Sequence, residues 1–152
     1  MDKFKVAIVV PAYNEEATIK QVIDGIKQYG DVILVNDASS DFTEKRALEA
    51  GAIIVNHDTN QGYDNALNSG FIEADKRNYD AIITFDADGQ HNPEALSEYI
   101  SRLRNGTDLV LGIRSNQANF AEWLLMVCSK YKFDWQDPLC GMKGYSMKIY
   151  RD

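Results

Sequence analysis

Five short apolar runs alternate with helix-like segments along most of the chain, and this alternation restricts the fold more than any other feature. The runs, rich in β-branched residues, are residues 4–10, 32–35, 52–55, 81–85 and 108–111. Between them apolar residues recur at helical spacing, as Ile19, Val22 and Ile26 do. Strands that alternate strictly with helices form a parallel sheet, because each helix carries the chain back to the start of the next strand. We therefore expect an α/β fold with a mostly parallel, twisted sheet and helices on both faces.

The sequence marks the start or end of some predicted helices more clearly than of others. One helix is expected over residues 40–50, and Asn92 is expected to cap a later one that has Pro93 in its first turn. After the fifth run the alternation fades. Residues 118–131 look helical, and residues 138–146 look irregular or like a short strand. A chain of 152 residues suits one domain.

Charge excludes some classes of partner. The chain has 23 acidic and 16 basic residues and a net charge of −7. A nucleic-acid-binding protein would need clustered Lys and Arg, so no nucleic-acid partner is expected. An acidic chain that binds a phosphate ligand needs a cation to offset the repulsion. No signal peptide and no run of about 20 apolar residues is visible, which predicts a cytoplasmic protein with reduced thiols.

Polar residues gather directly after the predicted strands. The clusters are residues 11–16, 36–41, 56–62 and 86–91, and residues 112–114 follow the fifth run. In an open α/β sheet, ligands bind in the crevice beyond the carboxyl ends of the strands. One such cluster could be a simple turn. All of them along one edge of the sheet predict a ligand site.

Asp86 and Asp88 suggest a metal site after the fourth strand. Residues i and i+2 of an extended segment point the same way, so both carboxylates could share a cation. Gly89 allows a turn, and Gln90 offers another oxygen. Mg²⁺ or Mn²⁺ would suit such oxygen ligands. For these residues alone a solvated turn is the commoner interpretation; the buried strand before them and the other clusters favour the metal.

Residues after the first two strands suggest nucleotide contacts. The Asp37 carboxylate could accept a hydrogen bond from a base or a ribose, Tyr13 could stack on the base, and Glu15 could bind ribose. Pro11 is expected to fix the turn that leaves the first strand.

Helix capping is the alternative for several of these polar residues. Asp37, Ser39 and Asp41 could merely cap the helix expected near residue 40, and Glu15 and Glu16 could favour the N-terminus of their own helix. We prefer this interpretation for Ser39 or Ser40 and for Glu16. For Asp37 we prefer a functional role, because it precedes the expected cap.

Phosphate-binding loops of known type are absent from the sequence. No Gly-x-Gly-x-x-Gly follows a strand and no Gly-x-x-x-x-Gly-Lys-Ser/Thr occurs, which argues against a dinucleotide cofactor and a P-loop. A diphosphate would then need cations, and Arg114 is the natural partner beside a metal. An ordinary surface arginine remains an equal alternative for this position.

Taken together, the motifs resemble the family 2 glycosyltransferases, and most of all the polyprenyl-phosphate sugar transferases of the dolichyl-phosphate mannose synthase type. They lie in the order typical of that family and cover residues 4–146. The matching segments are VVPAYNEE (9–16), VNDASSD (35–41), NQG (60–62), ALNSG (66–70), FDADGQHNPE (85–94), GIR (112–114) and DPLCGMKGY (137–145).

The resemblance implies a GT-A type fold with a Rossmann-like nucleotide-binding half. Residues 1–152 would form a single catalytic domain, with the nucleotide-sugar part in residues 1–114 and a short, truncated acceptor part in residues 115–152. Metal ligands by position would be Asp86, Asp88 and Gln90. The nucleotide-binding residues would be Pro11, Ala12, Tyr13, Glu15, Asp37, Asp86, Ala87 and Arg114. Asp137 falls where the family has an acidic residue beside the acceptor.

The expected reaction is inverting transfer of a sugar from a UDP- or GDP-sugar to a polyprenyl phosphate or a saccharide. A hydroxyl acceptor needs a general base, for which Asp137 is the candidate catalytic residue. A polyprenyl phosphate is already anionic and needs none. The alternative function is a non-catalytic nucleotide-sugar-binding domain, or half of a split enzyme that lacks a complete acceptor site.

Two departures from the family bear on these expectations. Asp64 and Asn65 stand where relatives usually have small residues, and Asp64 adds negative charge near the phosphates. The sequence also stops soon after Tyr145, so a homo-oligomer or a partner subunit could complete the acceptor side. The apolar residues 123–127 could touch the inner face of a membrane as a peripheral contact; a helix packed on the sheet is the simpler interpretation.

Overall fold

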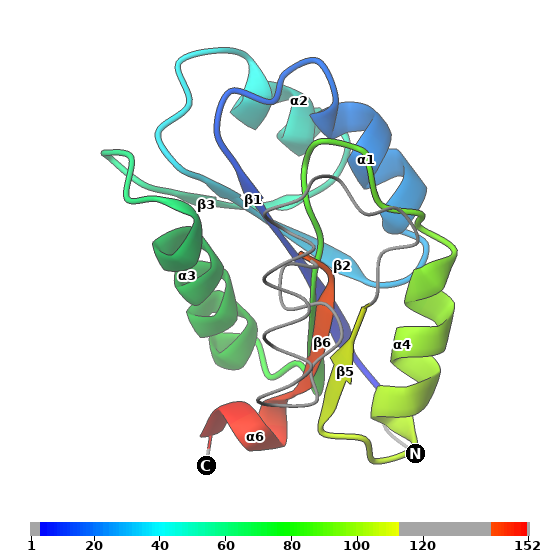
Figure 1. Ribbon diagram of the computed structural model, residues 1–152. Helices are drawn as coiled ribbons and strands as arrows, with labels where there is room; N and C mark the ends of the chain where they lie inside the picture. Colours follow the sequence, from blue (N-terminus) through cyan, green and yellow to red (C-terminus); the bar gives the residue numbers. More distant parts are fainter. Residues whose placement is uncertain (1–3, 113–140, 152) are drawn as a thin grey trace, which may run out of the picture.

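The computed structural model describes residues 4–112 and 141–151 of the chain (Figure 1). Six strands form one sheet in the order β3-β2-β1-β4-β6-β5. The strands are β1 (Val6–Ala12), β2 (Asp31–Asn36), β3 (Ile53–Asn56), β4 (Ala81–Thr84), β5 (Leu109–Leu111) and β6 (Lys143–Ser146). The helices are α1 (Ile19–Ile26), α2 (Thr43–Glu49), α3 (Tyr63–Lys76), α4 (Ala95–Arg104) and α6 (Met147–Arg151).

Most of the sheet is parallel, and one strand runs antiparallel to its neighbours. Strands β1 to β4 pair in parallel, with β1 between β2 and β4. The strand β6 pairs antiparallel with both β4 and β5 and so separates them. Of the two alternatives for residues 138–146, the short strand is confirmed for residues 143–146, which pair on both sides within the sheet. The fold is α/β, as expected.

Helices cover both faces of the sheet (Figure 1). On one face α1, α2 and α4 bury their apolar sides against alternate residues of the strands, including Ile8, Val10 and Leu34. On the other face α3 and the start of α6 pack on the intervening residues, including Val9 and Ile33. This alternation follows from the two-residue period of a strand. A parallel sheet buried on both faces explains why β1 is apolar throughout.

The first strand begins and ends two residues later than predicted, so Pro11 lies inside it rather than in a turn. Val9 O accepts a hydrogen bond from Phe85 N, so the backbone polar groups of Val9 and of Pro11, two residues on, face the β4 side. The strand β4 ends at Thr84, which pairs with Val9. The β1–β4 ladder ends just before Pro11, which has no N–H to continue it, so the proline interrupts no pairing with β4 and is tolerated.

Two predicted helix starts are corrected. Helix α2 begins at Thr43 rather than near residue 40, and the Asp41 carboxylate accepts a hydrogen bond from Thr43 N at 2.9 Å. Helix α4 begins at Ala95 rather than at the position after Asn92. Asn92 Oδ1 instead accepts from Glu94 N at 3.0 Å and closes a turn before the helix.

The helix expected over residues 118–131, including the apolar residues 123–127, lies outside the described residues. Among the described helices, none combines the length and the apolar composition that crossing a bilayer requires.

Gly70 is the point of closest approach between α3 and the sheet, which predicts a large cost for any side chain there. A Cβ atom at Gly70 would overlap Val9 Cγ1 and lie 3.2 Å from Val35 Cγ2. We expect Gly70→Ala to lower the free energy of unfolding by about 1–3 kcal/mol through overpacking, although alanine favours helices. Urea unfolding would measure the change. Gly25→Ala in α1 is the control, because its Cβ would meet only Pro93 Cγ at an ordinary 3.4 Å; equal stability of both variants would contradict the prediction.

Candidate functional site: a pocket at the carboxyl ends of the strands

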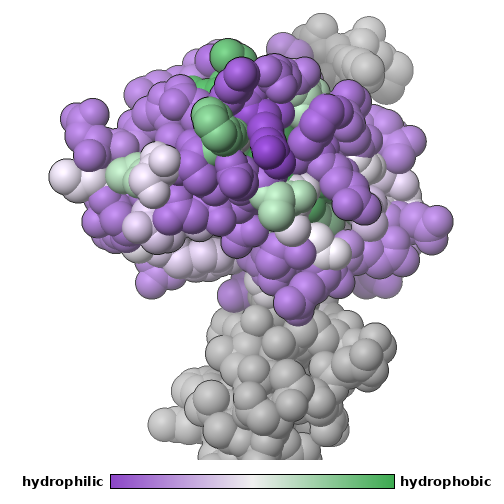
Figure 2. Space-filling view, turned by 90° about the horizontal axis from the view of Figure 1, so that it is seen from above, coloured by the Kyte–Doolittle hydropathy of each residue, from purple (hydrophilic) through white to green (hydrophobic). Residues whose placement is uncertain are grey.

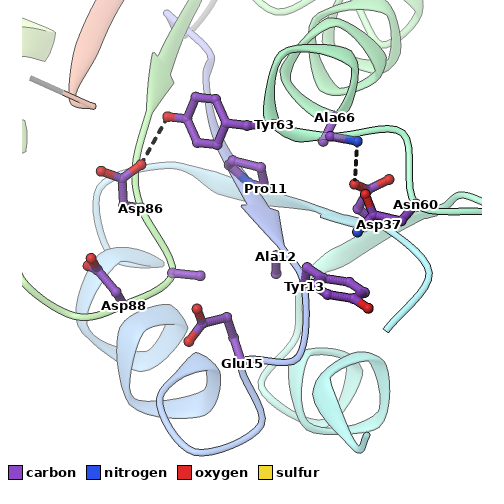
Figure 3. Close-up of a pocket in the computed structure, with 12 residues that line it drawn as sticks. Pro11, Ala12, Tyr13, Glu15, Asp37, Asn60, Tyr63, Ala66, Asp86 and Asp88 are labelled. Carbon is purple, nitrogen blue, oxygen red and sulfur yellow. Dashed lines mark hydrogen bonds between the residues drawn. The ribbon is translucent and has the colours of Figure 1, made fainter. Parts of the chain in front are cut away.

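A pocket of about 390 Å³ opens at the edge of the sheet where β1, β2 and β4 end (Figure 3). The molecular face that contains this edge is mostly hydrophilic, with scattered apolar residues (Figure 2). The lining residues are Pro11, Ala12, Tyr13, Glu15, Asp37, Asn60, Gly62, Tyr63, Ala66, Asp86, Ala87 and Asp88. Its volume falls within the range of small-molecule sites. The loops therefore meet at the crevice that the sheet topology predicts.

Asp86 and Asp88 form one side of the pocket (Figure 3). They follow β4 in a turn rather than in an extended segment, but both carboxylates still face the same cavity. Asp86 is held on two sides. Tyr63 OH donates to its Oδ1 at 3.0 Å, and His91 Nε2 lies 2.7 Å from its Oδ2.

The surroundings of Asp86 keep it ionised. Burial alone would raise its pKa, but the hydrogen bonds from His91 and Tyr63 and the charges of His91 and Lys143 hold the pKa below its ordinary value. Burial and the neighbouring Asp86 in turn raise the pKa of Tyr63, which therefore remains a protonated donor. The pocket thus contains a fixed negative charge.

Asp88 is more exposed and less constrained. Its Oδ1 accepts a hydrogen bond from Gln90 N at 2.9 Å, and its Oδ2 accepts none from the described residues. The Gln90 side chain is exposed and does not line the pocket. Within residues 4–112 and 141–151 no group of three or more His, Cys, Asp or Glu is arranged to hold a metal ion. Two carboxylates alone fit Mg²⁺ or Mn²⁺, ions that commonly take their other ligands from phosphate and water.

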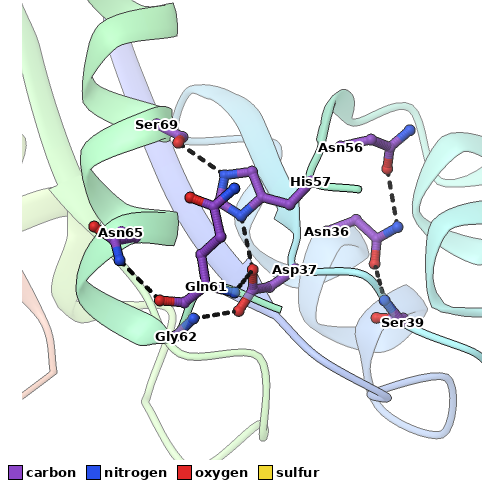
Figure 4. Close-up of polar contacts among 9 residues, drawn as sticks. All are labelled: Asn36, Asp37, Ser39, Asn56, His57, Gln61, Gly62, Asn65 and Ser69. Carbon is purple, nitrogen blue, oxygen red and sulfur yellow. Dashed lines mark hydrogen bonds and ion pairs between the residues drawn. The ribbon is translucent and has the colours of Figure 1, made fainter. Parts of the chain in front are cut away.

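Asp37 lies on the side of the pocket opposite Asp86 and Asp88. It is 4% exposed and is surrounded by hydrogen-bond donors (Figure 4). Its Oδ1 accepts from His57 Nδ1 at 2.7 Å and from Gln61 N at 2.8 Å, and its Oδ2 accepts from Gly62 N at 2.8 Å. Burial alone would raise the pKa of Asp37, but these bonds from Gln61, His57 and Gly62 outweigh it and lower the pKa.

His57 connects this carboxylate to helix α3. Its Nε2 lies 2.8 Å from Ser69 Oγ, so one imidazole joins the end of β2 to the second turn of α3 (Figure 4). Gly62, with φ of +87°, turns the chain into the helix at the point where its N–H reaches Asp37. The pocket wall from Asn60 to Ala66 is therefore fixed to β2 through Asp37 and His57.

Tyr13 and Glu15 reach the pocket from the loop after β1. The Tyr13 ring is 52% exposed, so one face is available to a flat ligand. Glu15 Oε2 accepts a hydrogen bond from Thr18 Oγ1 at 2.9 Å, which orients its carboxylate.

The loops after β1 and β2 are tied to each other, which corrects the capping roles expected for two residues. Ser39 Oγ accepts from Asn14 N at 3.0 Å, across the two loops. Glu16 Oε2 accepts from Phe42 N at 3.1 Å, so it serves the start of α2 and not its own helix. Ser40 N in turn donates to Asn14 Oδ1 at 2.8 Å. These bonds fix the loop that carries Tyr13 relative to the loop that carries Asp37.

The pocket is also lined by residues for which no role was predicted. Two residues with a predicted role lie outside the described part of the chain. Asn60, Gly62 and Ala66 line it and belong to the matching segments 60–62 and 66–70, whereas Tyr63 lines it and lies between those segments, where no role was predicted. The signal for this wall is the glycine before the helix. Arg114 and Asp137 lie outside the described residues.

Comparison with known proteins agrees with this geometry. Residues 7–151 match the family model described as glycosyl transferase family 2. The chain is 34% identical over 139 residues to the undecaprenyl-phosphate 4-deoxy-4-formamido-L-arabinose transferase of Proteus mirabilis, covering 83% of the chain and 41% of the relative. It is 32% identical over 127 residues to the UDP-N-acetylglucosamine–dolichyl-phosphate N-acetylglucosaminyltransferase of Methanococcus voltae, covering 70% and 51%. The chain therefore spans about half the length of these relatives.

A solved structure gives the same result for the fold. Glucosyl-3-phosphoglycerate synthase from Mycobacterium tuberculosis, in complex with Mn²⁺, UDP and glucosyl-3-phosphoglycerate, superposes with a TM-score of 0.77 at 26% identity. The match covers 95% of this chain and 57% of that one. The GT-A type of fold is confirmed, and the chain belongs to glycosyl transferase family 2.

Proposed function

We propose that this chain binds a UDP- or GDP-sugar together with a divalent cation and transfers the sugar, with inversion, to a polyprenyl phosphate or a saccharide. One observation carries the proposal. A single pocket brings the carboxylates of Asp86 and Asp88 to face Asp37 and Tyr13 across the end of β1. One side suits a metal-bound diphosphate and the other suits a nucleoside, which together make up a nucleotide-sugar donor.

The relatives support both halves of this proposal. The names of the Proteus and Methanococcus relatives specify undecaprenyl-phosphate and dolichyl-phosphate acceptors, and the second also specifies a UDP-sugar. The solved relative is a complex with Mn²⁺ and UDP. These are properties of those proteins, and they make the same classes of donor and acceptor the first to test here.

Asp88, with Asp86 beside it, would hold the cation. When bound, a divalent cation offsets the negative charge that grows on the leaving diphosphate. Tyr63 and His91 contribute by fixing the Asp86 carboxylate before the ligand arrives. A preorganised carboxylate does not have to reorient during the reaction, which is the usual advantage of such hydrogen bonds.

The remaining assignments concern donor and acceptor. Tyr13 would stack on the base, Asp37 would accept a hydrogen bond from it, and Glu15 would bind ribose. The acceptor attacks the anomeric carbon from the face opposite the leaving diphosphate, which inverts that centre. With a hydroxyl acceptor, Asp137 would remove the proton; with a phosphate acceptor it would only position the nucleophile.

Removal of the Asp88 carboxylate tests the cation assignment directly. We expect Asp88→Ala to abolish the part of nucleotide affinity that depends on Mn²⁺, because the carboxylate oxygen left open for a metal is lost. Isothermal titration calorimetry with UDP and GDP, with and without Mn²⁺, would measure this.

The control is Glu98→Ala on α4, which removes one negative charge at an exposed position far along the helix from the pocket. It should leave the effect of Mn²⁺ unchanged. If Asp88→Ala retained the full effect of Mn²⁺, the cation would not bind where we propose. If wild-type protein bound nucleotide but showed neither transfer nor slow hydrolysis of any sugar nucleotide, a binding domain would replace the transferase.

A further inference from the structure

The pattern of hydrogen bonds around Asp37 bears on which base the pocket accepts. An ionised carboxylate accepts about four hydrogen bonds, two at each oxygen. Oδ1 of Asp37 already receives two, from His57 Nδ1 and Gln61 N, and Oδ2 receives one, from Gly62 N. Counting donors from residues 4–112 and 141–151, a single acceptor position is left, and it is on Oδ2.

That position belongs to the pocket. Asp37 lines the cavity although only 4% of its surface is exposed, so the carboxylate meets a ligand through a narrow opening. Figure 3 shows it between Tyr13 and Asn60, on the side away from Asp86 and Asp88. A base stacked on Tyr13 would present its edge to Asp37 and Asn60.

The edges of uracil and guanine place different demands on this carboxylate. Uracil offers one donor, N3–H, between two carbonyl oxygens. Guanine offers two adjacent donors, N1–H and the N2 amino group, which a carboxylate satisfies by using both oxygens. With Oδ1 filled by protein donors, the carboxylate can satisfy only one of the two guanine donors, and guanine loses the paired hydrogen bonds that make a carboxylate a good partner for it.

Asn60 is suited to the rest of the uracil edge. Asn60 lines the same wall, and an amide nitrogen there can donate to one of the carbonyl oxygens beside N3–H. The backbone N–H groups of Gln61 and Gly62 are committed to Asp37 and are not available for this purpose. One acceptor next to one donor matches uracil.

We propose that the pocket takes a uridine diphosphate sugar in preference to a guanosine diphosphate sugar. This assignment rests on the proposed function, since it presumes that the nucleoside lies between Tyr13 and Asp37. It assigns His57 a role in specificity: by filling Oδ1 from the interior, the imidazole leaves the carboxylate with one acceptor for the base. His57 is thus a positioning residue, because it acts on the ligand through Asp37.

The test compares nucleotides that carry the same number of phosphates and differ only in the base. Wild-type protein is titrated calorimetrically with UDP and GDP in the presence of Mn²⁺, and with UMP and GMP without it, so that the base preference is measured apart from the cation. We expect UDP to bind about tenfold or more tightly than GDP, and UMP to be preferred over GMP in the same direction.

Two variants of His57 test the cause of the preference. His57→Phe keeps a ring but removes the donor to Oδ1, which opens a second acceptor position; the preference should fall to about threefold or less. His57→Asn keeps an N–H donor near the position of Nδ1, and the preference should persist. Circular dichroism and thermal unfolding confirm that each variant is folded before it is titrated.

The outcomes separate the two proposals. Equal or tighter binding of GDP by wild-type protein would overturn the base assignment and leave the proposed function in place. Binding of neither nucleotide, with or without Mn²⁺, would overturn the proposed function and the base assignment with it. An unchanged preference in His57→Phe would overturn the role of His57, whereas a reduced preference there and not in His57→Asn would support it.

Discussion

Asp37→Ala is expected to lower the free energy of unfolding by about 3 kcal/mol, because the substitution removes the partner of three buried or half-buried donors at once. The same carboxylate fixes the pocket wall to β2, so nucleotide affinity should be lost as well. Urea unfolding at neutral pH would measure the stability. Asp58→Ala, an exposed acidic residue of the neighbouring loop that does not line the pocket, is the control and should change stability by about 0.5 kcal/mol or less.

The difference between wild type and Asp37→Ala should depend on pH. The folded-state pKa of Asp37 is lowered, so its contribution to stability is fully present above the unfolded-state pKa and is lost as the pH falls through the folded-state pKa. The two proteins should therefore converge in stability as the pH falls below about 4. A difference that stayed constant down to the acid-unfolding limit would contradict the interpretation of Asp37 as an ionised anchor.

Gly141→Ala is expected to weaken Mn²⁺-dependent nucleotide binding by about tenfold or more while the protein still folds, with some loss of stability from the displaced Asp86 carboxylate. A Cβ atom at Gly141 would lie 2.6 Å from Asp86 Cγ and 2.7 Å from Asp86 Oδ1, and would overlap Oδ2. The carboxylate would have to move and give up its bonds with Tyr63 and His91. Calorimetry with UDP and GDP, with and without Mn²⁺, would report the loss.

Gly25→Ala again serves as the matched substitution, because it adds the same methyl group on α1 without a close contact. It should bind nucleotide as wild type does. If Gly141→Ala bound nucleotide as wild type does, the present position of the Asp86 carboxylate would not be required for Mn²⁺-dependent binding, and the prediction would be contradicted. Thermal unfolding of both variants would show that any loss of binding is not a loss of the folded protein.

Local sequence patterns were sufficient to predict the class of fold and the place of the pocket. The apolar runs of β1, β2 and β4 and the polar residues after them lie where a parallel sheet requires, so Tyr13, Asp37, Asp86 and Asp88 line one cavity. These features depend on periodicity and on the rule that ligands bind beyond the carboxyl ends of strands. Both can be read from short stretches of sequence.

Features that depend on distant residues could not be predicted in this way. The insertion of β6 between β4 and β5 joins residues more than 30 positions apart, and no pattern within either segment encodes it. The donors around Asp37 come from residues 57–62, and those on Asp86 come from Tyr63 and His91. A sequence shows that a carboxylate is present, but the partners that fill its oxygens become visible only in three dimensions.

The position of β6 has a consequence for the order of folding. Among the described strands, β5 pairs with β6 alone, and β6 is among the last of the described segments to be synthesised. Pairing of β6 with β4 and β5 closes a long loop, and the entropy lost in closing it opposes the pairing. We therefore expect this pairing to form more slowly than the pairing of β1, β2 and β4. The wall of the cavity that is built on β1 and β2, with Tyr13 and Asp37, needs none of this pairing. The wall with Asp86 lies against the backbone of Gly141, which precedes β6, so we expect that wall to reach its final form after the first.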